Sequence, residues 1–310
     1  MPKVSVIIPT IGRVESLRAL LESIAAQSRK PEEILVADGS GQEGIAALLA
    51  ASAWAGQGLR IVHLRVNPPN AVRQRQAAIA ASTGEFLFML DDDIVLDPAC
   101  LELMLELLEA DAGLSAVTAD FSNQSWSRPT TLWLCYLRWV HGIREGEWQG
   151  RVIGPLLRFG YNPSPAQPMP MEWLGAGNSL VRRSAYDAVG GFSDFFLHRC
   201  TINEDVDLGL KLRRVGGILL HPGARMAHHH APGGRMTVDL IAEDDMFNRF
   251  QIMRRTQNKT QSRAFCELLV FLTVEGLSSI RSCLRTGSWA RLMGQCKGWS
   301  RAFVRLASAS

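Results

Sequence analysis

The sequence predicts an α/β fold with a mixed, mostly parallel central sheet flanked by helices. The first observation is the apolar run over residues 86–90 (FLFML), which is typical of a strand buried on both faces of a parallel sheet. The second is that apolar strands and amphipathic helices alternate before this run, as in βαβ units. The third is the acidic triplet Asp91-Asp92-Asp93 directly after it, because open α/β sheets bind ligands at the carboxyl ends of their strands.

Hydrophobic periodicity and turn residues define the remaining elements of the first half. Leu17, Leu20, Leu21 and Ile24 recur at helical spacing and predict a helix over 15–28. The other predicted elements are strands over 4–8, 34–37, 61–64 and 115–119 and helices over 71–81 and 98–109.

The acidic triplet has two interpretations. Adjacent carboxylates repel one another unless a cation lies among them, and their oxygen atoms suit Mg²⁺ or Mn²⁺ holding a substrate diphosphate. Alternatively, Asp97-Pro98 resembles an N-cap followed by proline at the first helical position. Part of the acidic run would then be a polar strand-to-helix turn.

Composition indicates an ordinary globular protein. The chain has 310 residues, 47% of them hydrophobic, so it can bury a substantial core. Its six cysteines form no C-x-x-C pair, which argues against a zinc site or a disulfide framework and favours a reducing compartment. The N-terminal apolar run stops at Pro9 and does not resemble a secretory signal. We therefore expect a cytoplasmic protein.

Positive charge is concentrated at the C-terminal end. The net charge is +3, but segment 246–310 has eleven Lys/Arg against Glu267 and Glu275, or +9, which leaves −6 for residues 1–245. Its apolar segments, 264–272 and 277–284, are too short and too interrupted by charge to span a membrane. We expect amphipathic helices that lie on an anionic membrane surface, at the inner face of the cell membrane, pack on the preceding domain, or do both. No nucleic acid is expected, because no binding module accompanies the charge.

Four motifs carry a resemblance to a known family. They are residues 4–10 (VSVIIPT) with Arg13, 33–40 (EILVADGS), 74–76 (QRQ) and 84–93 (GEFLFMLDDD). In this order and spacing they resemble the family 2 glycosyltransferases, which are inverting and have the GT-A (Rossmann-like) nucleotide-diphospho-sugar transferase fold. The resemblance implies a UDP-, GDP- or dTDP-sugar donor and a divalent metal ion, Mg²⁺ or Mn²⁺.

The resemblance also implies a donor site. Its nucleotide-binding residues would be Pro9, Thr10, Asp38, Arg75, Asp91 and Asp92. Thr10 and Asp38 would lie against the base and Asp92 near the ribose, while Asp93 would bind the metal. Gln76 stands where the family usually has asparagine, which leaves Arg75 in place. The residues alone do not decide whether Asp38 binds the nucleotide, because Asp-Gly also occurs in ordinary turns.

A second group of motifs resembles the acceptor half of the same family. It comprises residues 172–179 (EWLGAGNS), 190–192 (GGF) and Glu204-Asp205, which open a predicted helix ending at 215. Acids at a helix start are favoured by the helix dipole in any protein, and the same dipole helps a base to stay ionised. By resemblance Asp205 is the catalytic base, and we expect Glu204 and Trp173 to contact the acceptor.

The run His228-His229-His230 suggests metal binding, but consecutive residues of an extended chain point to alternate sides and cannot converge on one ion. The family often has a metal-ligating histidine at the position of His228, which makes it the expected ligand. A surface histidine run is the alternative.

Two regions remain. Residues 121–171 have no clear periodicity, and residues 251–255 depart from a motif of processive synthases. Residues 121–171 contain Trp126, Trp133, Trp139 and Trp148, which suit sugar stacking, a lipid headgroup or core packing. Residues 251–255 (QIMRR) lack the tryptophan of the Q-x-x-R-W motif of processive synthases, which favours single transfers.

These observations predict three regions and one function. Residues 1–120 would form the nucleotide-sugar-binding half, 121–245 the acceptor half with the Trp-rich insert, and 246–310 a basic helical extension. The predicted function is inverting transfer of a sugar to a hydroxyl of a glycan or lipid-linked acceptor, in cell-surface polysaccharide or glycolipid biosynthesis. The alternatives are a sugar-phosphate nucleotidyltransferase and a non-catalytic sugar- or membrane-binding scaffold of the same fold. The oligomeric state is left open.

Overall fold

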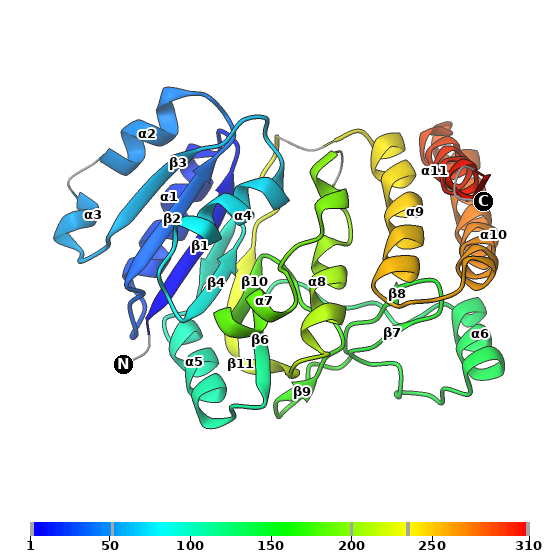
Figure 1. Ribbon diagram of the computed structural model, residues 1–310, viewed down its shortest axis with the longest axis horizontal. Helices are drawn as coiled ribbons and strands as arrows, with labels where there is room; N and C mark the ends of the chain where they lie inside the picture. Colours follow the sequence, from blue (N-terminus) through cyan, green and yellow to red (C-terminus); the bar gives the residue numbers. More distant parts are fainter. Residues whose placement is uncertain (1–2, 51–52, 199–200, 234–235, 308–310) are drawn as a thin grey trace.

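A mixed sheet of nine strands forms the centre of the computed structural model, which describes residues 3–50, 53–198, 201–233 and 236–307 (Figure 1). The strands are β1 (Val4–Thr10), β2 (Glu33–Asp38), β3 (Ile61–Arg65), β4 (Phe86–Leu90), β5 (Ile94–Leu96), β6 (Leu114–Phe121), β9 (Met169–Pro170), β10 (Asn178–Arg182) and β11 (Gly217–His228). Their order is β3-β2-β1-β4-β10-β6-β11-β5, and β9 also pairs with β11.

One half of the sheet is parallel, as predicted. Strand β1 pairs with β2 and β4, and β2 pairs with β3, all in parallel. Every residue of β1, β2 and β4 is buried, since helices cover both faces of this part of the sheet. The carboxyl ends of the three strands therefore meet at one edge, where Thr10 lies opposite Asp38.

The other half of the sheet contains the antiparallel pairs of the predicted mixed sheet. Strand β10 lies antiparallel between β4 and β6, and β5 is antiparallel to the end of β11. Pro222 and Gly223 interrupt the apolar pattern of β11. The strand continues to His228 past a register shift between His221 and Arg225.

The position of β5 contradicts the alternative prediction that part of the acidic triplet is a turn leading from a strand directly into a helix. It separates the triplet from the next helix, α5 (Cys100–Ala110), whose N-cap residue is Ala99. Asp97 is therefore not the N-cap that the sequence suggested. Its backbone instead accepts a hydrogen bond from Cys100 N at 3.0 Å and donates one to Arg225 O at 3.0 Å.

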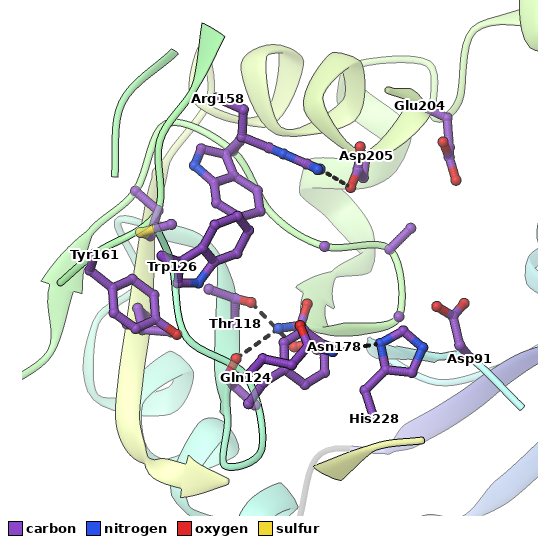
Figure 2. Close-up of a pocket in the computed structure, with 18 of the residues that line it drawn as sticks. Asp91, Thr118, Gln124, Trp126, Arg158, Tyr161, Asn178, Glu204, Asp205 and His228 are labelled. Carbon is purple, nitrogen blue, oxygen red and sulfur yellow. Dashed lines mark hydrogen bonds and ion pairs between the residues drawn. The ribbon is translucent and has the colours of Figure 1, made fainter. Parts of the chain in front are cut away.

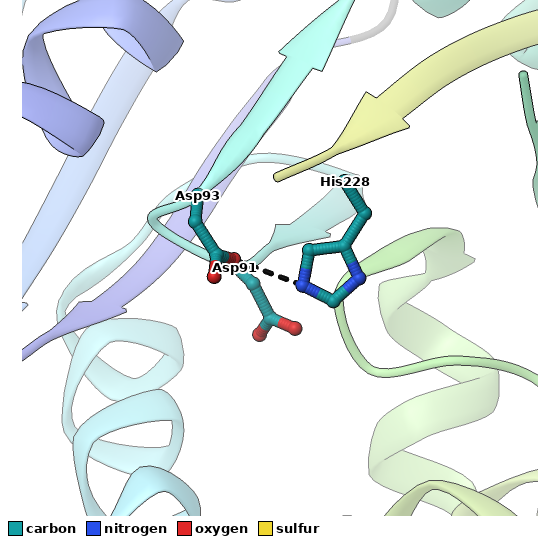
Figure 3. A group of neighbouring side chains, drawn as sticks. All are labelled: Asp91, Asp93 and His228. Atoms are coloured by element: carbon teal, nitrogen blue, oxygen red, sulfur yellow. Dashed lines mark ion pairs between the residues drawn. The ribbon is translucent and has the colours of Figure 1, made fainter. Parts of the chain in front are cut away.

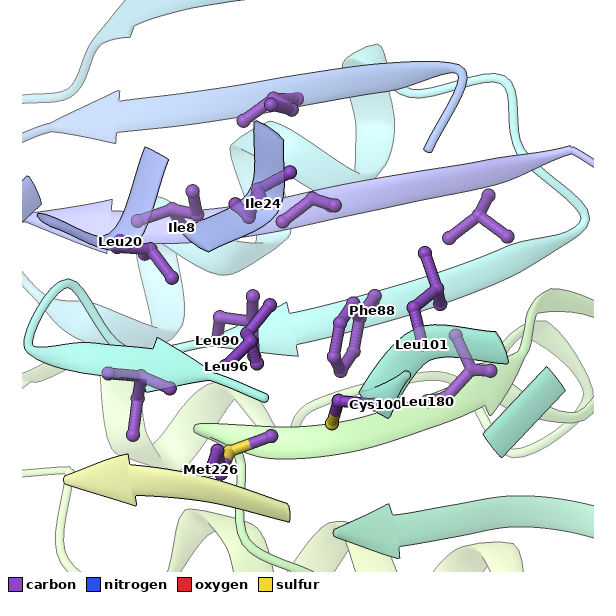
Figure 4. Close-up of a cluster of buried hydrophobic side chains, with 14 of the residues drawn as sticks. Ile8, Leu20, Ile24, Phe88, Leu90, Leu96, Cys100, Leu101, Leu180 and Met226 are labelled. Carbon is purple, nitrogen blue, oxygen red and sulfur yellow. The ribbon is translucent and has the colours of Figure 1, made fainter. Parts of the chain in front are cut away.

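Helices cover the two faces of the sheet and bury a separate core on each. On one face lie α1 (Val14–Ala25), α2 (Glu43–Ala50), α3 (Ala53–Gly56) and α5. On the other lie α4 (Ala71–Ala81), α7 (Arg183–Ala188), the 3₁₀ helix η1 (Asp194–His198) and α8 (Glu204–Leu212). In the first core, Leu20 and Ile24 of α1 lie beside Ile8 of β1, and Cys100 and Leu101 of α5 lie beside Phe88 of β4 (Figure 4). Helix α1 ends three residues before the predicted position, and α5 begins two residues after it.

The Trp-rich region and the basic extension share a third core. The elements are α6 (Thr131–His141), the hairpin β7 (Val152–Ile153) and β8 (Leu157–Arg158), α9 (Val238–Arg255), α10 (Gln261–Thr286) and α11 (Ala290–Ala307). Trp133 and Trp148 are buried here, and Trp133 stacks on Phe271 of α10. The two apolar segments of the tail are parts of one helix, α10. The extension therefore packs on the preceding domain, one of the two arrangements that we expected.

Two glycines allow α11 to lie directly against α9. A Cβ atom added at Gly294 would lie 2.1 Å from Asp239 O, and one at Gly298 would lie 2.2 Å from Glu243 O. Arg301 of α11 pairs with Glu243 at 2.9 Å. The close contact and the ion pair fix α11 on the body of the protein.

No helix within the described ranges is long and apolar enough to cross a membrane. The five described cysteines are free, and Cys200 lies outside the described residues.

Candidate active site

The ends of β1 and β2 bring together the residues predicted for the nucleotide. Pro9 and Thr10 lie opposite Ala37 and Asp38 in the parallel ladder. The side chain of Gln74, on α4, donates hydrogen bonds to Thr10 O at 2.8 Å and to Ala37 O at 2.7 Å. Gln74 therefore ties the two strand ends together, a role that the sequence did not indicate.

Asp38 is buried in a tight turn. Its Oδ1 accepts hydrogen bonds from the backbone N and the hydroxyl of Ser40, at 2.8 and 2.6 Å. Its Oδ2 lies 3.4 Å from His63 Nε2, and no hydrogen bond reaches it from the described residues. His63 Nε2 likewise has no hydrogen-bond partner among the described residues. A buried acceptor calls for a donor, and either His63 or a ligand N–H would supply it here.

Two arginines lie among the three carboxylates of the triplet. Arg75 Nη2 is 2.6 Å from Asp91 Oδ1, and Arg13 Nη1 is 2.9 Å from Asp92 Oδ1 and 3.5 Å from Asp93 Oδ2. The positive charge that adjacent acids require is thus partly supplied by the chain itself. Arg13 belonged to the first motif but was not predicted as a site residue.

Both oxygen atoms of Asp92 are occupied by the protein. Thr10 Oγ1 donates to Oδ2 at 2.7 Å, and Arg13 donates to Oδ1. Burial raises the pKa of Asp92 above its ordinary value, although the bonds from Thr10 and Arg13 oppose that shift. Asp92 therefore braces the ends of β1 and β4, and its contact with a ribose stays a prediction.

Asp91, Asp93 and His228 form a group whose ligand atoms all lie within 4.8 Å of one another (Figure 3). The pairing of Ile94 in β5 with His228 in β11 brings the histidine to the triplet, and His228 Nε2 lies 3.0 Å from Asp93 Oδ1. Burial alone would raise the pKa of Asp93, but His228, the N–H of Ala231 and Arg13 lower it below its ordinary value. Two carboxylates and an imidazole suit a divalent cation such as Mn²⁺.

Arg75 links the acids at the start of α8 to this group. Arg75 is buried, and its guanidinium reaches Glu204 Oε1 at 3.4 Å as well as Asp91. Arg158 Nη1, from the hairpin, lies 2.9 Å from Asp205 Oδ2. The predicted donor and acceptor halves are thus joined by one arginine, and each acid of the pair has its own cation.

The two acids of the pair have different environments. Burial and the neighbouring Asp205 raise the pKa of Glu204 to about 8, although Arg75 opposes the shift. The raised pKa favours the protonated form of Glu204, which can donate a hydrogen bond. Asp205 instead faces the guanidinium of Arg158. Different environments of this kind commonly assign two carboxyl groups to different roles.

A cavity of about 240 Å³ opens between these acids and the Trp-rich region (Figure 2). The lining includes Arg75, Asp91, Thr118, Gln124, Trp126, Arg158, Tyr161, Trp173, Asn178, Glu204, Asp205, His228 and His230. The space is therefore polar on the side of the acids and aromatic on the opposite side.

Two tryptophans form the aromatic wall. Trp126 and Trp173 meet edge to face, with ring centroids 5.1 Å apart, and the guanidinium of Arg158 lies 5.0 Å from the Trp173 ring centre. Trp173 Nε1 donates to Phe159 O at 2.8 Å, which fixes its ring. A flat aromatic surface beside hydrogen-bonding groups suits the apolar face of a sugar ring.

The structure brings some predicted site residues to the cavity and leaves others at the sheet edge. Arg75, Asp91, Trp173, Glu204, Asp205 and His228 line it, whereas Pro9, Thr10, Asp38, Asp92 and Asp93 do not. Sequence reasoning missed Arg158 and singled out Trp126 only as one of four tryptophans. It also missed Gln124, whose Nε2 lies 3.2 Å from His228 Nδ1 and 2.9 Å from His230 Nε2. Gln124 and Trp126 lie in an irregular segment and Arg158 lies in the two-residue strand β8, so no periodicity marks their positions.

Fold comparison first defines the class of protein. A solved structure described as GalNAc-T7 with UDP, GalNAc and Mn²⁺ aligns with a TM-score of 0.56 over 78% of this chain and 47% of that one, at 13% sequence identity. The sheet with its helices on both faces is that of the GT-A glycosyltransferases. At this identity the likeness establishes the fold only.

The family follows from the sequence itself. Residues 5–188 match the model of glycosyl transferase family 2, which is more than half of the chain, so the protein belongs to that family. Its relatives include the O-antigen biosynthesis protein RfbC of Myxococcus xanthus, 27% identical over 82% of this chain and 19% of that protein. An N-acetylglucosaminyl-diphospho-decaprenol L-rhamnosyltransferase of Mycobacterium tuberculosis is 42% identical over 20% of each chain. The chain thus spans about a fifth of the length of these relatives.

Proposed function

We propose that this protein transfers a sugar from a nucleoside diphosphate sugar to a hydroxyl group of a glycan or lipid-linked acceptor, with inversion at the anomeric carbon. The observation that carries the proposal is the position of Arg75. It joins Asp91, a member of the group formed with Asp93 and His228, to Glu204, which lies beside Asp205. Relatives named for O-antigen biosynthesis and for transfer to a diphospho-decaprenol carrier support a role in making a cell-surface polysaccharide or glycolipid.

The donor would bind along the ends of β1, β2 and β4. Asp38 Oδ2, which no hydrogen bond reaches from the described residues, would accept one from a base N–H, and Pro9 and Thr10 beside it would flank the base. Asp91, Asp93 and His228 would hold Mg²⁺ or Mn²⁺, and Asp92 would lie near the ribose. When bound, such a cation offsets the negative charge that develops on a diphosphate leaving group.

The acceptor would occupy the cavity. Its sugar ring would pack on Trp126 and Trp173, and the protonated Glu204 would donate a hydrogen bond to it. Asp205 would take the proton from the attacking hydroxyl, after which its partner Arg158 stays close to the newly formed carboxylic acid. A single displacement by that hydroxyl, on the face opposite the leaving group, inverts the carbon.

The first test is a calorimetric titration with UDP, GDP and dTDP, each with Mn²⁺ and with a chelator. We expect one nucleotide to bind in a metal-dependent manner and the Asp93→Ala variant to lose that dependence, because Asp93 belongs to the group formed with Asp91 and His228. The matched control is Asp187→Asn, an exposed acid on α7. Binding of none of the three nucleotides, or metal-dependent binding by Asp93→Ala, would refute the donor site.

A second test separates the base from the donor site. The Asp205→Asn variant should bind the nucleotide as the wild type does and should lose about 10²- to 10⁴-fold in transfer rate, since a positioned base contributes that much. Release of nucleoside diphosphate, with a panel of oligosaccharide and lipid-linked acceptors, measures the rate. Release of pyrophosphate would instead indicate a nucleotidyltransferase, and full activity of Asp205→Asn would remove Asp205 as the base.

A further inference from the structure

Helix α10 presents a stripe of four apolar side chains to solvent between residues 269 and 284, with the exposed Thr273 between the first two. The stripe consists of Leu269, Leu277, Ile280 and Leu284, with exposed fractions of 46%, 52%, 39% and 77%. At 100° per residue these four side chains fall within one quarter of the helix circumference. The buried side of the same helix, with Leu268, packs in the third core. The stripe is therefore surplus to folding, and an apolar surface of this kind usually has a partner.

Two further apolar side chains are exposed just after the end of α10. Gly287 caps α10 in the left-handed conformation, and the chain then exposes Trp289 and Met293 at the start of α11. Helices α10 and α11 lie at the end of the molecule farthest from α2 and α3, with α9 between them and α8 (Figure 1). The apolar surface thus lies at one end of the protein, on helices that the rest of the chain holds in place.

The charge around the stripe is positive. Arg281 and Arg285 are exposed beside it, and neither forms an ion pair within the part of the chain that the structure describes. The two acids of the α10–α11 segment are Glu267 and Glu275. Glu267 is paired with Lys259 and Arg263, while Glu275 is paired with Arg291. Neither acid of the described part of α10 and α11 is therefore left to neutralise the arginines that flank the stripe.

We propose that the stripe of α10, together with Trp289 and Met293, docks on the surface of an anionic lipid bilayer. Leucine and isoleucine side chains would enter the boundary of the acyl chains, tryptophan favours the headgroup level, and Arg281 and Arg285 would reach anionic headgroups. The helix would lie in the plane of the interface. This inference stands on the surface itself and does not depend on the proposed function.

Charge decides between a bilayer and a second copy of the chain. Two copies joined through the stripe would bring the arginines of one copy close to those of the other, and like charges across an interface oppose association. An anionic bilayer supplies both the apolar layer and the negative charge that the surface lacks. The bilayer is therefore the partner to which the surface is complementary.

Co-sedimentation with vesicles tests the charge of the surface. We expect the full chain to bind phosphatidylcholine vesicles that contain phosphatidylglycerol and to bind much more weakly to phosphatidylcholine alone, with lower affinity as salt rises. Replacing both arginines, Arg281→Ala with Arg285→Ala, should weaken binding roughly 30-fold. The control is Arg18→Ala with Arg65→Ala, which makes the same charge change on exposed arginines of α1 and β3. Equal loss in the control would mean that net charge, rather than this surface, causes binding, and would overturn the proposal.

A second pair of variants tests the apolar part. Leu277→Ser with Leu284→Ser should weaken binding to the anionic vesicles about tenfold or more, while Val215→Ser, an exposed residue after α8, should leave it unchanged. Both sites are exposed, so an unaltered urea midpoint is expected and shows that folding is intact. Wild-type binding by the leucine variant, no binding of the wild type at low salt, or a dimer that these substitutions dissociate would each overturn the proposal.

Discussion

Arg249 of α9 provides a sharp test of how the helical extension supports the candidate active site. Its Nε lies 3.0 Å from both oxygen atoms of Asp245, and its Nη1 donates to Pro155 O at 3.0 Å and to Leu156 O at 2.7 Å. Asp245 in turn accepts a hydrogen bond from Asn203 at 2.7 Å, just before the acids of α8. One arginine therefore holds both the loop that leads to Arg158 and the residue that precedes Glu204.

The Arg249→Met variant should be clearly destabilised. The arginine side chain is only 13% exposed. Without it, two carbonyl groups and one carboxylate lose their hydrogen-bond donors, and water has little access to replace those donors. Lost hydrogen bonds of about 1 kcal/mol each and a broken, largely buried ion pair together predict a decrease of about 3 kcal/mol in the free energy of unfolding. For a chain of this size that corresponds to a fall in Tm of roughly 6 °C.

Urea denaturation measures this change, provided that the slope of the transition is the same in both proteins. Arg249→Lys keeps the charge but not the forked geometry, so we expect an intermediate loss. The matched control is Arg285→Met, an exposed arginine near the end of α10, which should change stability by less than about 0.5 kcal/mol. If Arg249→Met were no less stable than that control, the linking role of Arg249 would be wrong.

The remaining predictions concern packing and pH. Gly298→Ala should lower the free energy of unfolding by about 2 kcal/mol, because the new Cβ would lie 2.2 Å from Glu243 O. The control is Gly276→Ala, whose Cβ would have no neighbour nearer than 3.9 Å and which should be neutral or stabilising. Burial raises the pKa of Glu33, but bonds from Ser5 and Thr83 outweigh it and hold the pKa below its ordinary value. The stabilisation from Glu33 is thus present above about pH 4.3 and is lost as pH falls through the lowered pKa. Glu33→Gln should therefore be less stable than the wild type at pH 7 by urea denaturation, and the difference should shrink in acid; a gap that is constant with pH would contradict this reasoning.

The sequence predicted those parts of the fold that depend on short stretches of chain. Strands β1, β2 and β4 were found because continuous apolar runs are the local signature of a strand buried on both faces. Their ends carry Asp38 and the acidic triplet, so the edge that holds the candidate donor site was predictable as well. The start of α8 at Glu204 was also correct, since acids at a helix start are a local signal.

The site as a whole was decided by tertiary structure. His228 reaches Asp93 only because β5, three residues long, pairs with the end of a strand interrupted by Pro222. Such a short strand has no periodicity of its own and forms because its partner is already in place.

The same reason applies to the contacts across the cavity. Nothing near Arg75 in the sequence predicts that it bridges Asp91 and Glu204, and nothing near Arg158 predicts its pairing with Asp205. The sequence by itself determined the strands, the helices and the residue types available at their ends. Packing between segments distant in the chain decided which of those residues meet. Local periodicity identifies an element but contains no information about the segment against which that element packs.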